Sequence, residues 1–139
     1  MGEKNIHYFK NRTAWKNWLL VNHCNYDELW MLFYKKASDK KGISYSDAVE
    51  EAICHGWIDS IIKRLNEETY LRKFTPRKLN SSWSPTNIAR AEKMLTAGQM
   101  QATGKKAYEH FLQSGKRPVK SKVSDKSIKL PLYLIKVLK

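Results

Sequence analysis

"SYSDAVEEAICHGWIDSIIKRLNEETYLRKFTP", residues 44–76, contains a helix start, a helix end and two strands in succession. Ser44 is followed three residues later by Asp47, which is the spacing of a helix capping box. Val49, Ala52 and Ile53 then recur on one helical face, as expected of a stripe that packs against a core. Gly56 stands where a left-handed residue often ends a helix. The segment from Ser44 to His55 is therefore predicted to be a helix.

The second half of the same stretch favours an antiparallel hairpin. "WIDSIIKRL", residues 57–65, mixes branched apolar residues with charge, and in "TYLRKFT", residues 69–75, Tyr70, Arg72 and Phe74 alternate with Leu71 and Lys73. Period-two alternation is typical of a strand with one buried face. The link at residues 66–68 contains no glycine, so the turn type stays open.

Further elements follow on both sides of this hairpin. Trp15, Trp18 and Leu19 define one face of a helix over 12–22, and the apolar run at 29–34 reads as a buried central strand. Ser84-Pro85 is a typical helix start, which predicts a helix over 85–97. The other expected segments are a helix over 104–113, a basic linker over 114–127 and a short apolar helix over 128–139. Together these elements predict an α+β fold in which four to five helices pack a small antiparallel sheet, with a single domain over 1–113.

The charge is strongly positive and unevenly distributed. The 139 residues carry a formal charge of +13, of which +6 lies in residues 1–110 and +7 in residues 111–139. Such a field attracts polyanions such as nucleic acid, an acidic protein or an anionic membrane surface, without selecting among them. A merely soluble, lysine-rich surface is the alternative. The first residues lack the apolar core of a signal peptide, and the chain contains no 18 consecutive apolar residues. We therefore expect no signal peptide and no membrane span, and the protein is expected to be cytoplasmic.

No cofactor, metal site or catalytic motif is predicted. The two cysteines, Cys24 and Cys54, match no zinc spacing and are interpreted as two small buried hydrophobes. Cys54 and His55 are residue types that form nucleophile–base pairs in enzymes. Adjacent side chains at a helix end, however, diverge by about 100°, which opposes a hydrogen bond between the two. The pairs Glu50-Glu51 and Glu67-Glu68 are interpreted as solvated charge.

The segment "FTPRKLNSSWSPTN", residues 74–87, is the candidate binding site. A helix starting after Ser84 directs free N–H groups and partial positive charge at its N-terminus, which favours an anion such as carboxylate, phosphate or sulfate. The alternative is structural: Ser84 caps its own helix, Trp83 fills the core, and Asp59 pairs with Arg77 or with Arg72 across the hairpin. The residues assigned to the site are Trp57, Asp59, Arg77, Lys78, Ser82, Trp83, Ser84, Asn87 and Arg90.

Residues 6–112 resemble the YdeI/OmpD-associated family, also called bacteriocin-protection proteins. The motifs that carry the resemblance are Gly56-Trp57-Ile58-Asp59, Phe74-Thr75-Pro76-Arg77, Trp83-Ser84 with Asn87, and Gly98-Gln99-Met100. The resemblance implies a role in protection against bacteriocins and cationic antimicrobial peptides and brings no catalytic residues. A chain of charge +13 should not sequester cationic peptides, so an indirect route through an anionic ligand is expected. Longer members of the family continue with a further helical region after the segment that corresponds to residues 128–139. Without that region, the final apolar helix would need a partner to cover it, so a homodimer is a further expectation.

Three functional hypotheses follow. The first is a non-enzymatic stress or resistance protein that binds a small anion or acidic partner near residues 77–87. The second is a nucleic-acid-binding protein that uses the basic body and tail, with strongly salt-dependent affinity. The third is an unrecognised enzyme that uses Asp59 and His55, with Tyr70 as a further candidate.

Overall fold

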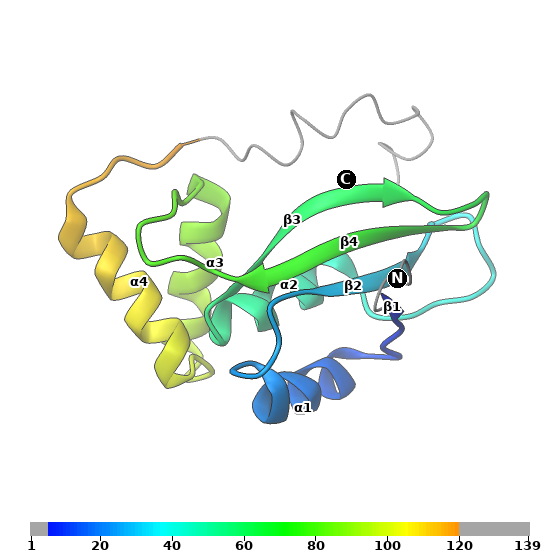
Figure 1. The fold of residues 1–139 in the computed structure, drawn as a ribbon, viewed down its shortest axis with the longest axis horizontal. Helices are drawn as coiled ribbons and strands as arrows, with labels where there is room; N and C mark the ends of the chain where they lie inside the picture. Colours follow the sequence, from blue (N-terminus) through cyan, green and yellow to red (C-terminus); the bar gives the residue numbers. More distant parts are fainter. Residues whose placement is uncertain (1–5, 120–139) are drawn as a thin grey trace.

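The computed structural model describes residues 6–119, and helix α2 (Tyr45–Cys54) is the central helix of this part. It begins as predicted, because the hydroxyl of Ser44 accepts a hydrogen bond from the backbone N–H of Asp47 at 3.1 Å. It ends before Gly56, whose φ is 79°. Helix α2 contacts α1, α3, α4 and β3, and Figure 1 shows it behind the sheet.

The sheet in residues 6–119 has four strands in the order β1-β2-β4-β3: β1 (Ile6–His7), β2 (Leu29–Tyr34), β3 (Trp57–Arg64) and β4 (Thr69–Pro76). The α+β class, the internal position of β2 and the β3–β4 hairpin are confirmed. The prediction of a purely antiparallel sheet is wrong, since β1 pairs parallel with β2. β1 has only two residues, which are too few to show the alternation of a strand in the sequence. Helix α1 connects β1 to β2, and such a crossover lets β2 run in the same direction as β1.

Asn66 explains how the hairpin turns without glycine. Its side-chain oxygen accepts hydrogen bonds from the backbone N–H groups of Glu68 and Thr69 at 2.9 and 3.0 Å. It also accepts one from the hydroxyl of Thr69 at 2.9 Å. An Asn side chain that accepts these bonds forms an Asx-turn, which mimics a backbone turn. The chain can therefore reverse direction here without a glycine.

The other helices of the described part are α1 (Arg12–Asn22), α3 (Pro85–Thr96) and α4 (Ala102–Ser114). Their positions confirm the predicted helices, but α4 begins two residues earlier than expected. Gly104 therefore lies inside α4, where a Cβ would stand 2.3 Å from the carbonyl oxygen of Cys54. The absent side chain lets α4 approach the backbone of α2, a contact that no single-sequence pattern reveals.

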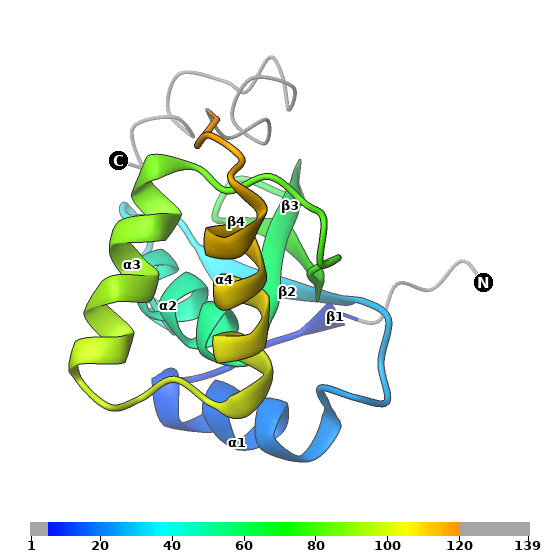
Figure 2. The same ribbon diagram turned by 90° about the vertical axis from the view of Figure 1, so that its left-hand side faces the viewer.

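One face of the sheet supports the core and is covered by helices. The register places Leu29, Met31 and Phe33 of β2 opposite Phe74, Arg72 and Tyr70 of β4, all of them buried. Trp15 of α1 packs on this face, with ring centroids 5.4 Å from Phe74 and 6.4 Å from Trp57. The turned view in Figure 2 shows α3 and α4 side by side, with α1 beneath them.

The predicted helix over 128–139 and most of the predicted basic linker lie outside the described residues. Within residues 6–119, no helix combines the length and apolar character needed to cross a membrane.

Candidate anion-binding site

A buried ion pair stands at the centre of the candidate site. Asp59 of β3 and Arg72 of β4 both lie on the helix-covered face of the sheet, and Nη1 of Arg72 donates to Oδ2 of Asp59 at 2.7 Å. Only 6% and 5% of these side chains are exposed. The register shift between Asp59 and Ile62 interrupts the regular pairing of the two strands. Of the two partners that the sequence offered Asp59, the fold selects Arg72.

Tyr45, the first residue of α2, brings a second arginine to the pair. Its hydroxyl donates to Oδ2 of Asp59 at 3.4 Å, and the guanidinium carbon of Arg72 lies 3.9 Å from its ring centroid. Arg90 of α3 approaches the same ring at 5.5 Å. Burial, together with the negative charge of Asp59, raises the pKa of Tyr45 to about 12, so its hydroxyl stays protonated.

Arg77 follows β4 directly and forms the third cation. Its guanidinium carbon lies 3.9 Å from the ring centroid of Trp83, and its Nη1 donates to the hydroxyl of Ser81 at 2.9 Å and to the carbonyl of Ser82 at 2.8 Å. Burial lowers the pKa of Arg77 to about 10, although the charge of Asp59 opposes this shift. Desolvation of a cation without adequate compensation produces such a shift.

Residues at or just before the start of α3 contact both Arg77 and Arg90. The hydroxyl of Ser84 accepts a hydrogen bond from the backbone N–H of Asn87 at 3.1 Å, which confirms Ser84 as the N-cap. The side-chain oxygen of Asn87 in turn accepts a hydrogen bond from Nη1 of Arg90 at 2.8 Å. The positive end of the helix dipole thus adds to the two guanidinium groups. We call Asp59, Arg72, Arg77, Arg90 and Tyr45 the arginine cluster.

The other residues assigned from the sequence occupy several environments. Trp83 is buried against Tyr108 and Phe111, so only its contact with Arg77 joins it to the cluster. Trp57 packs in the core against the tryptophans of α1. Lys78 and Ser82 are exposed beside Arg77, and within residues 6–119 the side chain of Lys78 makes no hydrogen bond or ion pair, so Lys78 is left out of the arginine cluster.

The residue that sequence reasoning missed is Tyr45. It follows a helix cap, and only the approach of α2 to β4 turns it into a platform for two guanidinium groups. The three residues around it, Asp59, Arg72 and Arg90, were recognisable individually but not as its neighbours.

Two buried donors at the cluster remain without a hydrogen-bond partner: Nε of Arg72 and Nε1 of Trp83. Unsatisfied buried donors are uncommon, and each costs about 1–3 kcal/mol relative to a bonded one. Both are donors, so the local imbalance favours a molecule that brings acceptor atoms.

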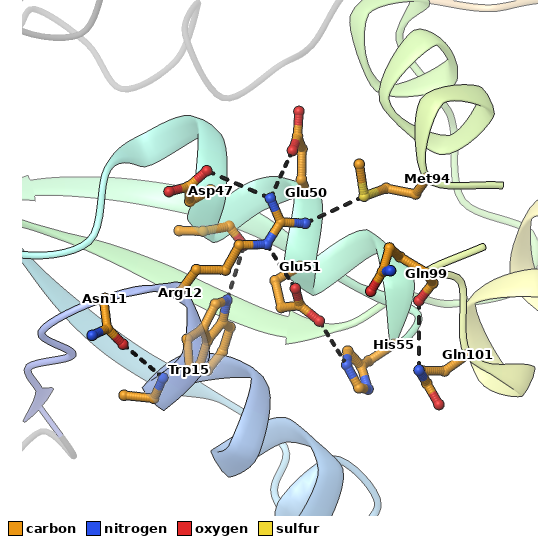
Figure 3. A network of polar contacts seen from close by, with 12 residues as sticks. Asn11, Arg12, Trp15, Asp47, Glu50, Glu51, His55, Met94, Gln99 and Gln101 are labelled. Atoms are coloured by element: carbon orange, nitrogen blue, oxygen red, sulfur yellow. Dashed lines mark hydrogen bonds and ion pairs between the residues drawn. The ribbon is translucent and has the colours of Figure 1, made fainter. Parts of the chain in front are cut away.

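A second polar network, drawn in Figure 3, joins α1, α2 and α3. Arg12 donates from Nε to Oε1 of Glu51 at 2.8 Å and from Nη1 to Oε1 of Glu50 at 2.9 Å. Oε2 of Glu51 lies 3.2 Å from Nε2 of His55, and Oε2 of Glu50 accepts from Nζ of Lys93 at 2.8 Å. The interpretation of Glu50-Glu51 as solvated charge is wrong, because helix packing buries both side chains.

The ion pairs of this second network hold α1 and α3 against α2. The side chain of His55 is 0% exposed, and its ring has Glu51 as its hydrogen-bond partner. Asp59 belongs to the arginine cluster, so the two groups of the enzyme hypothesis stand in separate networks with separate partners. Tyr70, the third candidate, is buried against Phe33.

The two cysteines lie in different environments. Cys54 is buried, and burial followed by the charge of Glu51 raises the pKa of its thiol to about 12. Cys24 is exposed, which corrects the prediction that both cysteines are buried. Among residues 6–119, no group of three or more His, Cys, Asp or Glu side chains is arranged to hold a metal ion.

The fold and the cluster define a small α+β domain with an excess of arginine at one helix start. Comparison with protein-family models matches residues 7–107 to a family described as Domain of unknown function (DUF8412). The chain belongs to this family. Neither the curated proteins nor the solved structures gave a match. The resemblance to the YdeI/OmpD-associated family stays a prediction, because none of these findings bears on it.

Proposed function

We propose that this protein is a non-enzymatic binding protein that holds a small anion at the arginine cluster. The observation that carries the proposal is the absence of a carboxylate partner for Arg77 and Arg90. Within residues 6–119, neither makes an ion pair, although both are half-buried. Arg12, at comparable depth, has three carboxylates around it. A bound anion would supply the missing negative charge.

Arg77 in particular is costly to leave without a counter-charge. A guanidinium removed from water needs a counter-charge or a full set of acceptors, and burial already lowers the pKa of Arg77 to about 10. An anion beside this group would stabilise its charged form. Binding energy at this position would therefore come from relieving a cost that the unliganded fold carries.

Aromatic rings support the proposal by holding the guanidinium groups in place. Arg77 stacks on Trp83, and Arg90 lies over Tyr45. A cation held against a ring loses less conformational entropy when a ligand arrives. The groups at the cluster are cations, a carboxylate already paired and a tyrosine with a raised pKa, which favours binding over acid–base chemistry.

The resemblance to bacteriocin-protection proteins suggests the setting of this binding. Because the chain carries a charge of +13, we propose that any role in stress or antimicrobial resistance is indirect and runs through the bound anion or an acidic partner. Direct capture of cationic peptides would oppose the electrostatic field of the protein.

The test is a titration of the full chain followed by intrinsic tryptophan fluorescence, because Arg77 lies on the ring of Trp83. Phosphate, sulfate, acetate, nucleotides and short DNA and RNA would be compared at low and physiological salt. We expect saturable binding of a small anion that Arg77→Ala weakens by at least tenfold. Lys78→Ala is the matched control, since it removes the same charge from an exposed neighbour.

Circular dichroism would establish that both variants are folded, and Arg90→Gln provides a second, milder change at the cluster. Equal effects of Arg77→Ala and Lys78→Ala would refute a specific site. Binding of nucleic-acid polymers alone, unchanged by Arg77→Ala, would instead favour the nucleic-acid hypothesis.

A further inference from the structure

The charges of the cluster indicate which anion would fit. Arg72 and Asp59 form a pair of zero net charge at 2.7 Å. Arg77 and Arg90 then contribute one positive charge each. The sum is +2, before the partial charge of the α3 N-terminus is added. An anion of charge −2 would neutralise the cluster, whereas a monoanion would leave one guanidinium uncompensated.

Arg77 and Arg90 each keep side-chain donors that make no hydrogen bond within residues 6–119. Arg77 makes both of its side-chain hydrogen bonds through Nη1, and Arg90 makes its single one through Nη1. Within the described part of the chain, Nε and Nη2 of both residues donate to no protein acceptor. These two N–H groups form the side-on fork with which arginine binds two oxygens of one anion.

A side-on fork engages two oxygens along one edge of an anion, and a carboxylate has only one such edge. A tetrahedral oxyanion with three or four free oxygens has at least three such edges, so two forks can each engage a different edge. The forks belong to neighbouring features of the fold. Arg77 stacks on Trp83, the residue before the N-cap of α3, and Arg90 bonds Asn87, whose N–H is held by that cap.

We infer that the arginine cluster selects a doubly charged tetrahedral oxyanion, either free phosphate or sulfate or the terminal phosphate of a phosphomonoester, over monocarboxylates and singly charged phosphodiesters. This inference rests on the proposed function and specifies its ligand class. A phosphomonoester carries nearly two negative charges at pH 7, because its second pKa is about 6. A phosphodiester carries one charge and has two free oxygens.

The test is isothermal titration calorimetry of the full chain at constant ionic strength. The probes are sulfate, inorganic phosphate, methyl phosphate, dimethyl phosphate and acetate. At pH 7.5 we expect sulfate and methyl phosphate to bind at least tenfold more tightly than acetate or dimethyl phosphate. Methyl phosphate binding as tightly as the inorganic ions would assign the site to an esterified phosphate; preference for the inorganic ions would assign it to the free anion. Both outcomes support selection of a doubly charged oxyanion.

A pH comparison isolates the second charge. Between pH 7.5 and pH 5, the dianionic fraction of a phosphomonoester of pKa about 6 falls roughly tenfold. Methyl phosphate should weaken by about that factor. Sulfate keeps its charge, so the change in its affinity measures any titration of the protein itself. Equal weakening of both ligands would overturn the inference.

Variants separate failure of this inference from failure of the proposed function. Arg77→Gln or Arg90→Gln removes one fork, and we expect the sulfate-to-acetate affinity ratio to fall from at least ten to about three or less, with Lys78→Gln unchanged. If acetate binds as tightly as sulfate and still depends on Arg77, the dianion inference is wrong and the anion site remains. If no probe binds, both proposals fail.

Discussion

Removing the charge of Asp59 should strongly destabilise the fold, because Asp59 is the counter-ion of the buried Arg72. Asp59→Asn keeps the shape of the side chain and removes its charge, which leaves Arg72 buried without a counter-ion. At 2.7 Å and an effective dielectric constant of about 20, the lost Coulomb attraction is about 6 kcal/mol. The amide oxygen still accepts a hydrogen bond from a charged donor, which retains about 2 kcal/mol. We therefore expect a loss of about 4 kcal/mol in the free energy of unfolding, within the range of 3–5 kcal/mol typical of broken buried pairs.

The assay is urea unfolding at pH 7 and low salt, followed by tryptophan fluorescence and circular dichroism. The matched control is Glu67→Gln, which breaks the exposed pair with Arg64, a pair of 3.1 Å between side chains that are 45% and 86% exposed. Exposed pairs contribute about 0–1 kcal/mol. The control should therefore lose less than about 1 kcal/mol.

A double-mutant cycle completes the test. Removing both charges with Asp59→Asn and Arg72→Met should cost at least 2 kcal/mol less than the sum of the single losses, because neither charge is then stranded. A loss below about 1 kcal/mol for Asp59→Asn, or additive losses in the cycle, would refute the assignment of Asp59 as the counter-ion of Arg72. Sulfate should also stabilise Asp59→Asn more than the native chain, since the variant lacks the only carboxylate of the cluster.

Three further outcomes are expected. Gly104→Ala should lower the free energy of unfolding by about 2 kcal/mol in urea titrations, because overpacking against the backbone of Cys54 costs about 3 and helix propensity returns about 1; an unchanged or higher stability would contradict the close helix contact. Burial alone would raise the pKa of Glu51, but hydrogen bonds from its histidine and arginine neighbours outweigh burial and lower it. This carboxylate therefore stabilises the fold above its unfolded pKa of about 4.3 and loses that contribution as pH falls through the lower folded value. The stability difference between the native chain and Glu51→Gln should therefore shrink below about pH 4, and a difference that does not change with pH would contradict this role. A thiol reagent at pH 8 should modify one cysteine of the native chain, Cys24, and two after denaturation; rapid reaction of both would show that Cys54 is accessible.

The local elements of this fold could be read from the sequence because their signals are local. The cap at Ser44, the cap with proline at Ser84-Pro85 and the alternation of Tyr70, Arg72 and Phe74 each act within a few residues, and the helices and strands lie where these signals placed them. Strand β1 gave no such signal, since two residues form a strand only through the neighbour with which they pair.

The sequence by itself determined the capped starts of α2 and α3, the hairpin and a surplus of cations between residues 72 and 90, because spacing and residue type are sufficient for these. Tertiary structure decided which cations found partners. Packing of α1 and α3 against α2 buried Glu50 and Glu51 and gave them basic neighbours, while the register of β3 against β4 paired Asp59 with Arg72 and not with Arg77. Pairing of charges depends on distances between elements far apart in the chain, and local sequence does not encode those distances. Within the described residues, Arg77 and Arg90 are two half-buried arginines that this packing left near the N-terminus of α3 without a carboxylate in an ion pair.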